Sequence, residues 1–399
     1  MIEYVDSDKK NVLVLAQLNH EIRTTMKIFS NFESGNIHVV SAESPQSIQL
    51  TIPADNQTEI SQWFHFRLES DAHQPHHFTI NELATSAYPE GWTDYDVVAS
   101  YDREEWFRIP AQFDGNALTF DFIPEHESMY FAYFAPYSYD RHQDLLHSAQ
   151  THPACKLETL GHTLDNNDIS LLTIGEPSPE KKNIWIIGRQ HPGETMAEWF
   201  IEGLVLRLLD ETDTVGRSLL DNVVIRVVPN MNPDGSIRGH LRTNGIGVNL
   251  NREWQTPSMD RSPEVFLVRE RMLEVGVDMF LDIHGDEAIP YNFVAGSEGT
   301  PSYNARIAHL ENHFKQALLT ITPEFQDEFG YDKDEPGKAN LTVGSNWVGE
   351  QFKCLSYTVE MPFKDHISHA DELYGWSPER SVAFGHDMLA AVWATVDEL

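Results

Sequence analysis

The periodicity of apolar residues changes at about residue 138, which restricts the chain to two differently built parts. Before that point, short runs such as 63–68 and 117–122 alternate apolar and polar residues and are separated by turn residues. A period of two is typical of strands with one buried face. After it, apolar strand-like runs alternate with longer helical stretches, the pattern of a mostly parallel sheet covered by helices. We therefore predict a β-sandwich domain over 1–137 and an α/β domain with a mixed, mostly parallel sheet over 138–399.

Several elements of these two parts are predicted from local pattern. The strands expected in the second part are 184–188, 223–228, 279–283 and 355–359, and the expected helices are 196–209, 263–275 and 378–396. The short apolar stretch 12–18 is predicted to be a further strand near the N-terminus. The segment 324–344, rich in Asp, Glu, Gly and Pro, is predicted to be a surface loop at the rim of a site.

Acidic residues outnumber basic ones by more than two to one, with 62 Asp and Glu against 28 Lys and Arg and a net charge of −34. A field of that sign repels phosphate backbones and anionic lipids, so we predict no nucleic-acid or membrane binding. No uninterrupted apolar run approaches the roughly 18 residues of a membrane span. Cys155 and Cys354 lie far apart, which excludes a disulfide framework and a cysteine metal site and favours a cytoplasmic location.

Polar residues with catalytic potential follow three of the predicted strands. His191 and Glu194 come after 184–188, His284 follows 279–283 and Glu360 follows 355–359. In open α/β sheets, ligands bind beyond the carboxyl ends of the strands. These side chains are therefore expected to share one crevice.

The composition of this set suits a metal ion. Catalytic Zn²⁺ commonly takes two imidazoles and one carboxylate and keeps a fourth position open for water. His191 and Glu194, in a tight Pro-Gly turn, and His284 would supply such a set for one Zn²⁺ per chain. HxxE by itself is a weak pattern, because most of the 19 histidines of the chain are expected to be exposed or hydrogen-bonded residues. The helix-borne alternative, HEXXH, does not occur.

A hydrolytic metal site also needs a base that takes a proton from water and returns it to the leaving amine. Glu360 is the candidate for this role. Taken alone, a carboxylate at a strand end is more often paired with a nearby cation. The wider pattern is needed to decide between these two interpretations.

The segment 230–254 concentrates basic and amide side chains, namely Arg238, Arg242, Asn251 and Arg252. A guanidinium binds a carboxylate through two hydrogen bonds, which suits recognition of a free peptide C-terminus. A second arginine can stabilise an oxyanion. Any one of these arginines, taken singly, is more often a surface or ion-pairing residue.

Five motifs in this order resemble those of the M14 zinc carboxypeptidases, and among them most closely the cytosolic carboxypeptidases. They are HPGE at 191–194, NPDG at 232–235, the arginine in GHLRTNGIGVNLNREW at 239–254, DIHGD at 282–286 and YTVE at 357–360. The stretch from Trp63 to Tyr139, which ends in FAYFAPYSY, is similar to the small sandwich that precedes the peptidase domain in that group. The resemblance covers nearly the whole chain.

The resemblance implies removal of residues from the C-terminus of a peptide or protein by a metal-activated water. The implied Zn²⁺ ligands are His191, Glu194 and His284. Glu360 would be the general base and acid, and Arg242 would polarise the scissile carbonyl. Asn251 and Arg252 would hold the terminal carboxylate of the substrate.

Three departures from the family pattern stand out. Asn249 occupies a position where many members have an Asp that accepts a hydrogen bond from a zinc-bound His, and an amide is expected to weaken metal binding somewhat. A mobile tyrosine of the family has two candidates here, Tyr331 and Tyr291. Relatives that remove glutamate carry a basic residue where this chain has 344–347, and Lys338 is the nearest cation.

Two other functions would use part of the same pattern. A zinc amidohydrolase of N-acyl amino acids uses the same HxxE, Asn-Arg and His arrangement, although the N-terminal sandwich and NPDG favour the peptidase. A non-catalytic binding module is disfavoured, because ligands, base and carboxylate-binding residues are all present.

Overall fold

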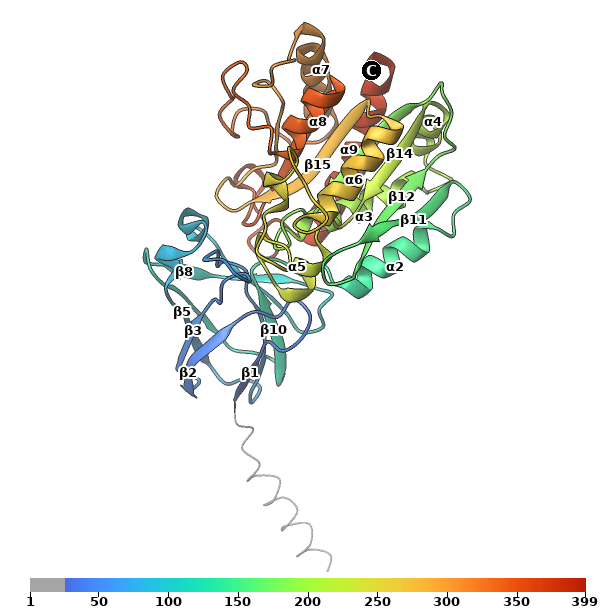
Figure 1. The fold of residues 1–399 in the computed structure, drawn as a ribbon. Coiled ribbons are helices and arrows are strands. Elements are labelled where there is room, and N and C mark those ends of the chain that lie inside the picture. The colour runs from blue at the N-terminus through green and yellow to red at the C-terminus, as the bar shows by residue number, and fades with distance from the viewer. Residues whose placement is uncertain (1–25) are drawn as a thin grey trace, which may run out of the picture.

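The structure is a computed structural model that describes residues 26–399, so the strand predicted at 12–18 lies outside the described residues. A sandwich of two sheets lies beneath a larger α/β part (Figure 1). No helix in the described range is both long enough and apolar enough to cross a membrane.

The N-terminal part is built from two five-stranded sheets. The first has the order β1 (Lys27–Phe29), β4 (His65–Glu69), β10 (Ser128–Ala132), β6 (Val97–Ser100), β7 (Phe107–Ile109). The second has the order β2 (His38–Ser44), β3 (Ser47–Thr51), β5 (His76–Ile80), β9 (Leu118–Phe122), β8 (Ala111–Phe113). Neighbouring strands are antiparallel except β3 and β5, which are parallel. The predicted all-β class is confirmed.

Aromatic side chains from both sheets fill the space between them. Phe78 and Phe120 stack at 4.6 Å, and Phe66 and Phe131 stack at 5.0 Å. All four rings are at most 2% exposed. Burying four aromatic rings removes a large apolar area from water, which is the main stabilisation available to a small sandwich.

The second part is built on a seven-stranded mixed sheet. Its order is β11 (Cys155–His162), β12 (Asp168–Ile174), β14 (Val223–Val228), β13 (Lys182–Gly188), β15 (Met279–Asp286), β17 (Leu355–Pro362), β16 (Phe293–Ala295). The four strands from β14 to β17 in this order are parallel, and the pairs at both ends are antiparallel. Parallel strands that are buried on both faces explain why these sequences are almost continuously apolar.

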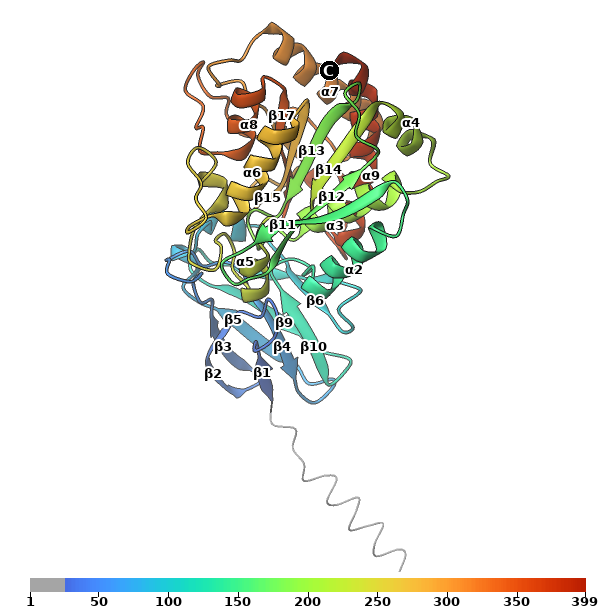
Figure 2. The same ribbon diagram turned by 45° about the vertical axis from the view of Figure 1, so that its right-hand side comes forward.

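Helices cover both faces of this sheet (Figures 1 and 2). Along β13, Ile184 and Ile186 point to the core shared with α3 (Met196–Leu208), α7 (Ala305–Ile321) and α9 (Pro378–Thr395). Trp185 and Ile187 point to the opposite core, which contains α6 (Pro263–Val275) and α8 (Gly344–Phe352). The remaining helices are α2 (Tyr139–Ala149), α4 (Thr214–Asn222) and α5 (Pro233–Arg238).

The predicted elements of the second part agree closely with the structure. α6 has the predicted bounds, and α3 and α9 each end one residue earlier than predicted. β15 and β17 each continue three residues further than predicted, so His284 and Glu360 lie inside the strands and not after them. The segment between α7 and α8 contains no helix or named strand, as predicted for a loop. The predicted boundary at 137–138 falls between β10 and α2 and stays a prediction.

The two parts are joined by a buried arginine. Arg108 of β7 donates to the carbonyl oxygens of Phe363 and Trp376 at 2.7 and 3.1 Å. It also donates to the carbonyl of Asp96 within the sandwich, at 2.9 Å. A guanidinium buried this deeply is costly unless its donors are satisfied, so these bonds tie the sandwich to the segment that follows β17.

Candidate active site

The side chains predicted to react come together at the carboxyl end of the parallel strands. β15 and β17 are paired in register, with His284 opposite Glu360. β13 lies on the other side of β15 and leads into the turn that carries His191 and Glu194. Because the three strands are parallel and adjacent, their ends meet at one edge of the sheet.

Two imidazoles and one carboxylate converge there. Nδ1 of His191 lies 2.6 Å from Oε1 of Glu194, and Nδ1 of His284 lies 2.7 Å from Oε2 of the same carboxylate. One ligand atom from each of the three residues lies within 4.8 Å of the other two. All three residues are buried, at no more than 3% exposed. No other such group of His, Cys, Asp and Glu is found in residues 26–399.

The turn that carries the first two residues is held by a buried ion pair. Arg189 adopts a left-handed conformation, with φ of 56°, immediately before Gln190 and His191. Its guanidinium pairs with Glu198 of α3 and donates to the carbonyl of Pro192 at 2.9 Å. These bonds offset the cost of the unusual backbone.

The outer nitrogens of both imidazoles also have partners. Nε2 of His284 lies 3.0 Å from Asp282, whose other oxygen accepts a bond of 2.6 Å from Gln190. Nε2 of His191 lies 3.1 Å from Oδ1 of Asn249. Such partners select the tautomer that leaves Nδ1 free to bind a metal. Asn249, which stands where many family members have Asp, therefore contacts His191 directly.

Burial and neighbouring charges shift the pKa values of the two histidines and of Glu194 in different directions. Burial, reinforced by the charge of Arg242, lowers the pKa of His191 to about 3, so its imidazole is neutral. Burial would also lower the pKa of His284, but the carboxylates of Asp282 and Glu194 raise it well above its ordinary value. Burial raises the pKa of Glu194, while the two histidines outweigh it and lower that pKa below its ordinary value.

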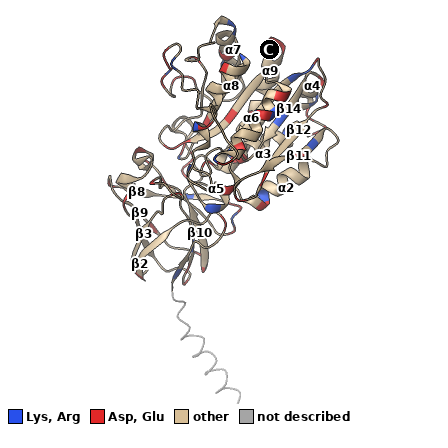
Figure 3. Cartoon of the chain, in the orientation of Figure 1, with Lys and Arg blue, Asp and Glu red and all other residues tan. Residues whose placement is uncertain are grey.

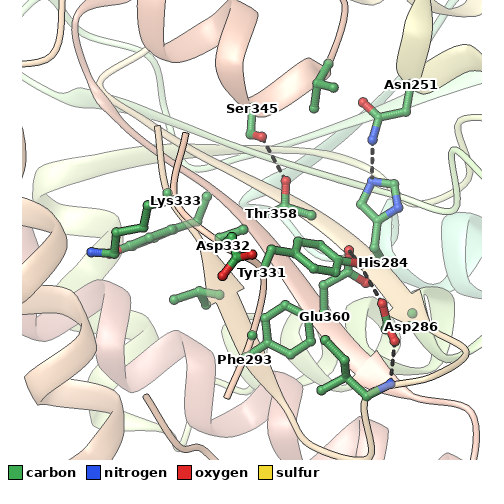
Figure 4. A pocket seen from close by; sticks show the side chains of 18 of the residues that line it. Asn251, His284, Asp286, Phe293, Tyr331, Asp332, Lys333, Ser345, Thr358 and Glu360 are labelled. Atoms are coloured by element: carbon green, nitrogen blue, oxygen red, sulfur yellow. Dashed lines mark hydrogen bonds between the residues drawn. The ribbon is translucent and has the colours of Figure 1, made fainter. Parts of the chain in front are cut away.

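Glu360 faces the same space from β17. Its Oε1 accepts a hydrogen bond of 3.1 Å from the hydroxyl of Tyr331, and its Oε2 has no hydrogen-bond partner among the described residues (Figure 4). Burial raises its pKa well above the ordinary value, since the opposing effect of His284 is smaller. A carboxyl group with one unoccupied oxygen and a raised pKa has the properties of a proton acceptor.

Two guanidinium groups line the same cavity as this centre, which has a volume of about 860 Å³. Arg242 and Arg252 line it together with Asn251. The amide oxygen of Asn251 accepts from the backbone nitrogen of Gly344 at 2.8 Å, which fixes the side chain at the start of α8. Burial and the nearby charge of Arg242 lower the pKa of Arg252, so an anion between the two groups would be stabilised.

The other cations that line the cavity are neutralised by acids. Lys333 lies 2.8 Å from Glu298, and Lys315 lies 2.9 Å from Asp327. Lys338, the cation expected nearest to the site, is not among the residues lining the cavity. Of the segment 344–347, Ser345 and Asn346 reach it, and the Ser345 hydroxyl bonds to that of Thr358 at 2.8 Å (Figure 4).

Of the two tyrosine candidates, one lines the cavity and the other does not. Tyr331 lines the cavity, and its hydroxyl lies 2.7 Å from Asp286 and 3.1 Å from Glu360, so one proton is shared between the two carboxyl groups. Tyr291 stacks on Phe329 at 4.7 Å and is not among the lining residues. Arg238 is also outside the cavity, where it pairs with Asp165 at 2.7 Å.

Sequence reasoning missed two residues of the sandwich that line the cavity, Tyr88 and Glu90. The guanidinium of Arg242 lies over the Tyr88 ring, 5.4 Å from its centroid. A cation over an aromatic face is a stabilising contact. No local pattern marked Tyr88, because its role depends on how the two parts dock.

Family comparisons agree with this geometry. A family model described as zinc carboxypeptidase matches residues 142–382. The chain belongs to the zinc carboxypeptidase family. A second model, described as the cytosolic carboxypeptidase N-terminal domain, matches residues 28–134. The enzyme is therefore a metallocarboxypeptidase, a hydrolase of the exopeptidase class, and its family implies a zinc cofactor.

This carboxypeptidase is similar to proteins of known structure over nearly its whole length. A putative carboxypeptidase A from Shewanella denitrificans is 53% identical, with a TM-score of 0.92 and 93% of this chain and 99% of that one covered. A metallo-carboxypeptidase from Pseudomonas aeruginosa, in complex with (2-guanidinoethylmercapto)succinic acid, is 45% identical, with a TM-score of 0.90 and coverages of 93% and 99%.

Another relative is much longer than this chain, and only part of it matches. Cytosolic carboxypeptidase 2 of Xenopus tropicalis is 31% identical over 90% of this carboxypeptidase. The chain spans 40% of that protein. The predicted family and the predicted fold class are thereby confirmed.

Proposed function

We propose that the chain cleaves the last peptide bond, or an isopeptide-like bond, at the C-terminus of peptides or protein tails, using one zinc ion. The observation that carries this proposal is the convergence of His191, Glu194, His284 and Glu360 on a cavity lined by two guanidinium groups. His191, Glu194 and His284 would hold the ion.

The donor set fits zinc chemically. Two imidazole nitrogens and a carboxylate are the ligands of many catalytic zinc sites, and here they are buried and face one another. The low pKa of His191 keeps its nitrogen available for a metal. When bound, zinc acts as a Lewis acid and lowers the pKa of water.

Glu360 is proposed as the general base and acid. Its Oε2 has no hydrogen-bond partner among the described residues, and burial raises its pKa, which favours accepting a proton from water. The Tyr331 hydroxyl fixes the other oxygen. One carboxyl group would thus carry the proton from water to the leaving amine.

Arg242 and Arg252 are proposed to have different roles in catalysis and substrate binding. Arg242 would stabilise the negative charge that develops on the scissile carbonyl oxygen. Asn251 and Arg252 would hold the terminal carboxylate, which restricts cleavage to the chain end. In support, the bound ligand of the Pseudomonas aeruginosa relative is a succinic acid derivative, which carries carboxylates.

The charged side chains that line the cavity affect which C-terminal residue of a substrate would be preferred. Both lysines that line it are paired with acids, so among the described lining residues neither offers an unpaired ammonium group to a glutamate side chain. This pairing argues against a preference for C-terminal glutamate. Peptides that differ only in the last residue would test it, and fastest cleavage of the glutamate peptide would contradict it.

The central test compares free-acid peptides, their C-terminal amides and N-acyl amino acids as substrates of the full chain. We expect cleavage of free-acid peptides only, with about one zinc per chain by metal analysis. Hydrolysis of N-acyl amino acids alone would support the amidohydrolase instead. Glu360→Gln is expected to keep its zinc and to lose at least about a thousandfold in kcat, and an active variant would refute the assigned base.

A cytoplasmic location is also proposed. Relatives are named cytosolic carboxypeptidases, and both cysteines, Cys155 and Cys354, are buried and unpaired. Thiols of this kind suit a reducing compartment. Fractionation of the source cells would test the location.

A further inference from the structure

We propose that Asp55, a residue of the N-terminal sandwich, positions Arg242 for catalysis. The inference rests on the proposed role of Arg242. The sandwich would thereby act on the reaction indirectly, through a carboxylate that lies outside the cavity and touches no reacting atom.

Asp55 is the common acceptor for three consecutive backbone amides of the Arg242 loop. Its Oδ1 accepts from the backbone nitrogen of Leu241 at 2.7 Å. Its Oδ2 accepts from the backbone nitrogens of Arg242 and Thr243, at 2.9 and 3.0 Å, and from the Thr243 hydroxyl at 3.0 Å. The carboxylate is only 3% exposed. Four hydrogen bonds to one buried carboxyl group thus attach the loop to the sandwich.

Two glycines of the same loop also lie against the sandwich. Residues 239–249 form turns without a helix or strand. Gly239 has a φ of +72°, and a Cβ there would lie 2.6 Å from the carbonyl oxygen of Ser34 in the sandwich. A Cβ at Gly247, with a φ of +82°, would lie 2.4 Å from the carbonyl oxygen of Asn56. Both glycines permit close contact between the backbone of the loop and that of the sandwich.

The sandwich also contacts the other end of Arg242. Its guanidinium lies over the ring of Tyr88. The backbone of Tyr88 is fixed by Gln62, which accepts from its nitrogen at 2.8 Å and donates to its oxygen at 3.1 Å. Backbone and guanidinium of Arg242 are therefore both held by the sandwich, although the residue belongs to the α/β part.

Loss of the carboxylate should affect catalysis through Arg242. In Asp55→Asn, an NH₂ group replaces an acceptor and faces backbone donors, so the loop must move. A misplacement of about 1 Å in a positioned group costs up to roughly a hundredfold in rate. Because an oxyanion contact is made only in the transition state, we expect kcat to fall about 10- to 100-fold with little change in KM.

The experiment is a double-mutant cycle with Arg242→Ala in the full chain, read by kcat and KM on a free-acid peptide. We expect Asp55→Asn to lower kcat in the wild-type background and to change it less than about twofold when Arg242 is already alanine. Equal losses in both backgrounds would overturn the proposal, as would an unchanged kcat in Asp55→Asn with zinc retained.

Two further variants distinguish a positioning role of Asp55 from a general effect on folding. Asp114→Asn makes the same change in a sandwich turn, where the carboxylate accepts from Asn116 and Ala117 at 2.8 Å, and should leave kcat unaltered. If Asp55→Asn does not fold, Thr243→Val removes one of the four bonds and should lower kcat in the same direction by a few-fold.

A second measurement does not depend on activity. Hydrogen exchange of a peptide spanning 239–245 should be faster in Asp55→Asn than in wild type, and unchanged in Asp114→Asn. Should the wild type cleave no peptide, the proposed function fails, while unaltered exchange in Asp55→Asn would show separately that Asp55 does not hold the loop.

Discussion

The amide oxygen of Asn249 lies 3.1 Å from Nε2 of His191, on the edge of the ring that faces away from Glu194. The second histidine has a carboxylate in the equivalent place, with Asp282 at 3.0 Å from Nε2 of His284. The two imidazoles therefore differ in the charge of their outer partner. A carboxylate raises the basicity of an imidazole ligand more than an amide does.

Asn249→Asp should tighten zinc binding, because it adds a negative charge behind His191. We expect an increase of roughly tenfold, at the lower end of the effect of such outer partners. Competition with a chelator would measure it. Asn249→Ala should weaken binding, and equal affinity in all three proteins would show that this contact does not tune the metal.

Tyr331→Phe should move the acid limb of the kcat/KM profile to higher pH. The Tyr331 hydroxyl donates to Glu360 and lowers its pKa, so removing the hydroxyl raises that pKa. Zinc content should not change. Tyr291→Phe is the matched control, since Tyr291 does not line the cavity. A displaced profile in the control variant and not in Tyr331→Phe would reverse our choice of tyrosine.

Arg252→Gln should raise KM for free-acid peptides with a smaller effect on kcat. A hydrogen bond to a charged group contributes about 1.5–3 kcal/mol, which corresponds to roughly 10- to 100-fold in KM. The variant should also discriminate less between a peptide acid and its amide. Arg238→Gln, whose side chain pairs with Asp165 outside the cavity, is expected to leave KM within about twofold.

Glu264→Gln should make the folded state less sensitive to pH. Burial raises the pKa of Glu264 from its ordinary value of 4.5 to about 8, and neither oxygen has a hydrogen-bond partner among the described residues. Between these values the folded state binds more protons than the unfolded state, so stability falls as pH rises. The slope contributed is at most about 1.4 kcal/mol per pH unit.

Urea unfolding at several pH values from 5 to about 8 would measure this slope. Glu264→Gln should flatten it. Glu270→Gln changes an exposed residue on the same helix, α6, and should leave the slope as in wild type. An unchanged slope in Glu264→Gln would mean that the buried carboxyl is not protonated in the folded state.

Much of the α/β part was predictable because its signals are local. Helical patterns located α3, α6 and α9 to within one residue at each end. The ends of β15 and β17 were underestimated by three residues each, since His284 and Glu360 are polar and break the apolar run. They are nevertheless strand residues, because pairing between the two strands continues to Asp286 and Pro362.

The contacts of Tyr331 and Asp55 could not be predicted in the same way. Tyr331 lies in a loop without periodicity, where sequence pattern offered two tyrosines and no means to choose. Asp55 and Arg242 are 187 residues apart and belong to different parts of the chain. Such a contact depends on the packing of one part against the other.

In the sequence alone, the order and spacing of the motifs determined the family and the residues proposed to bind zinc and substrate, and the change of apolar periodicity indicated the two-part organisation. Only the tertiary structure decided which tyrosine faces Glu360 and that the sandwich carries Asp55 and Tyr88 to Arg242. The physical reason is the difference between local and long-range interactions along the chain. Strand and helix periodicity is encoded by neighbouring residues, whereas the docking of two surfaces depends on side chains brought together from distant parts of the chain.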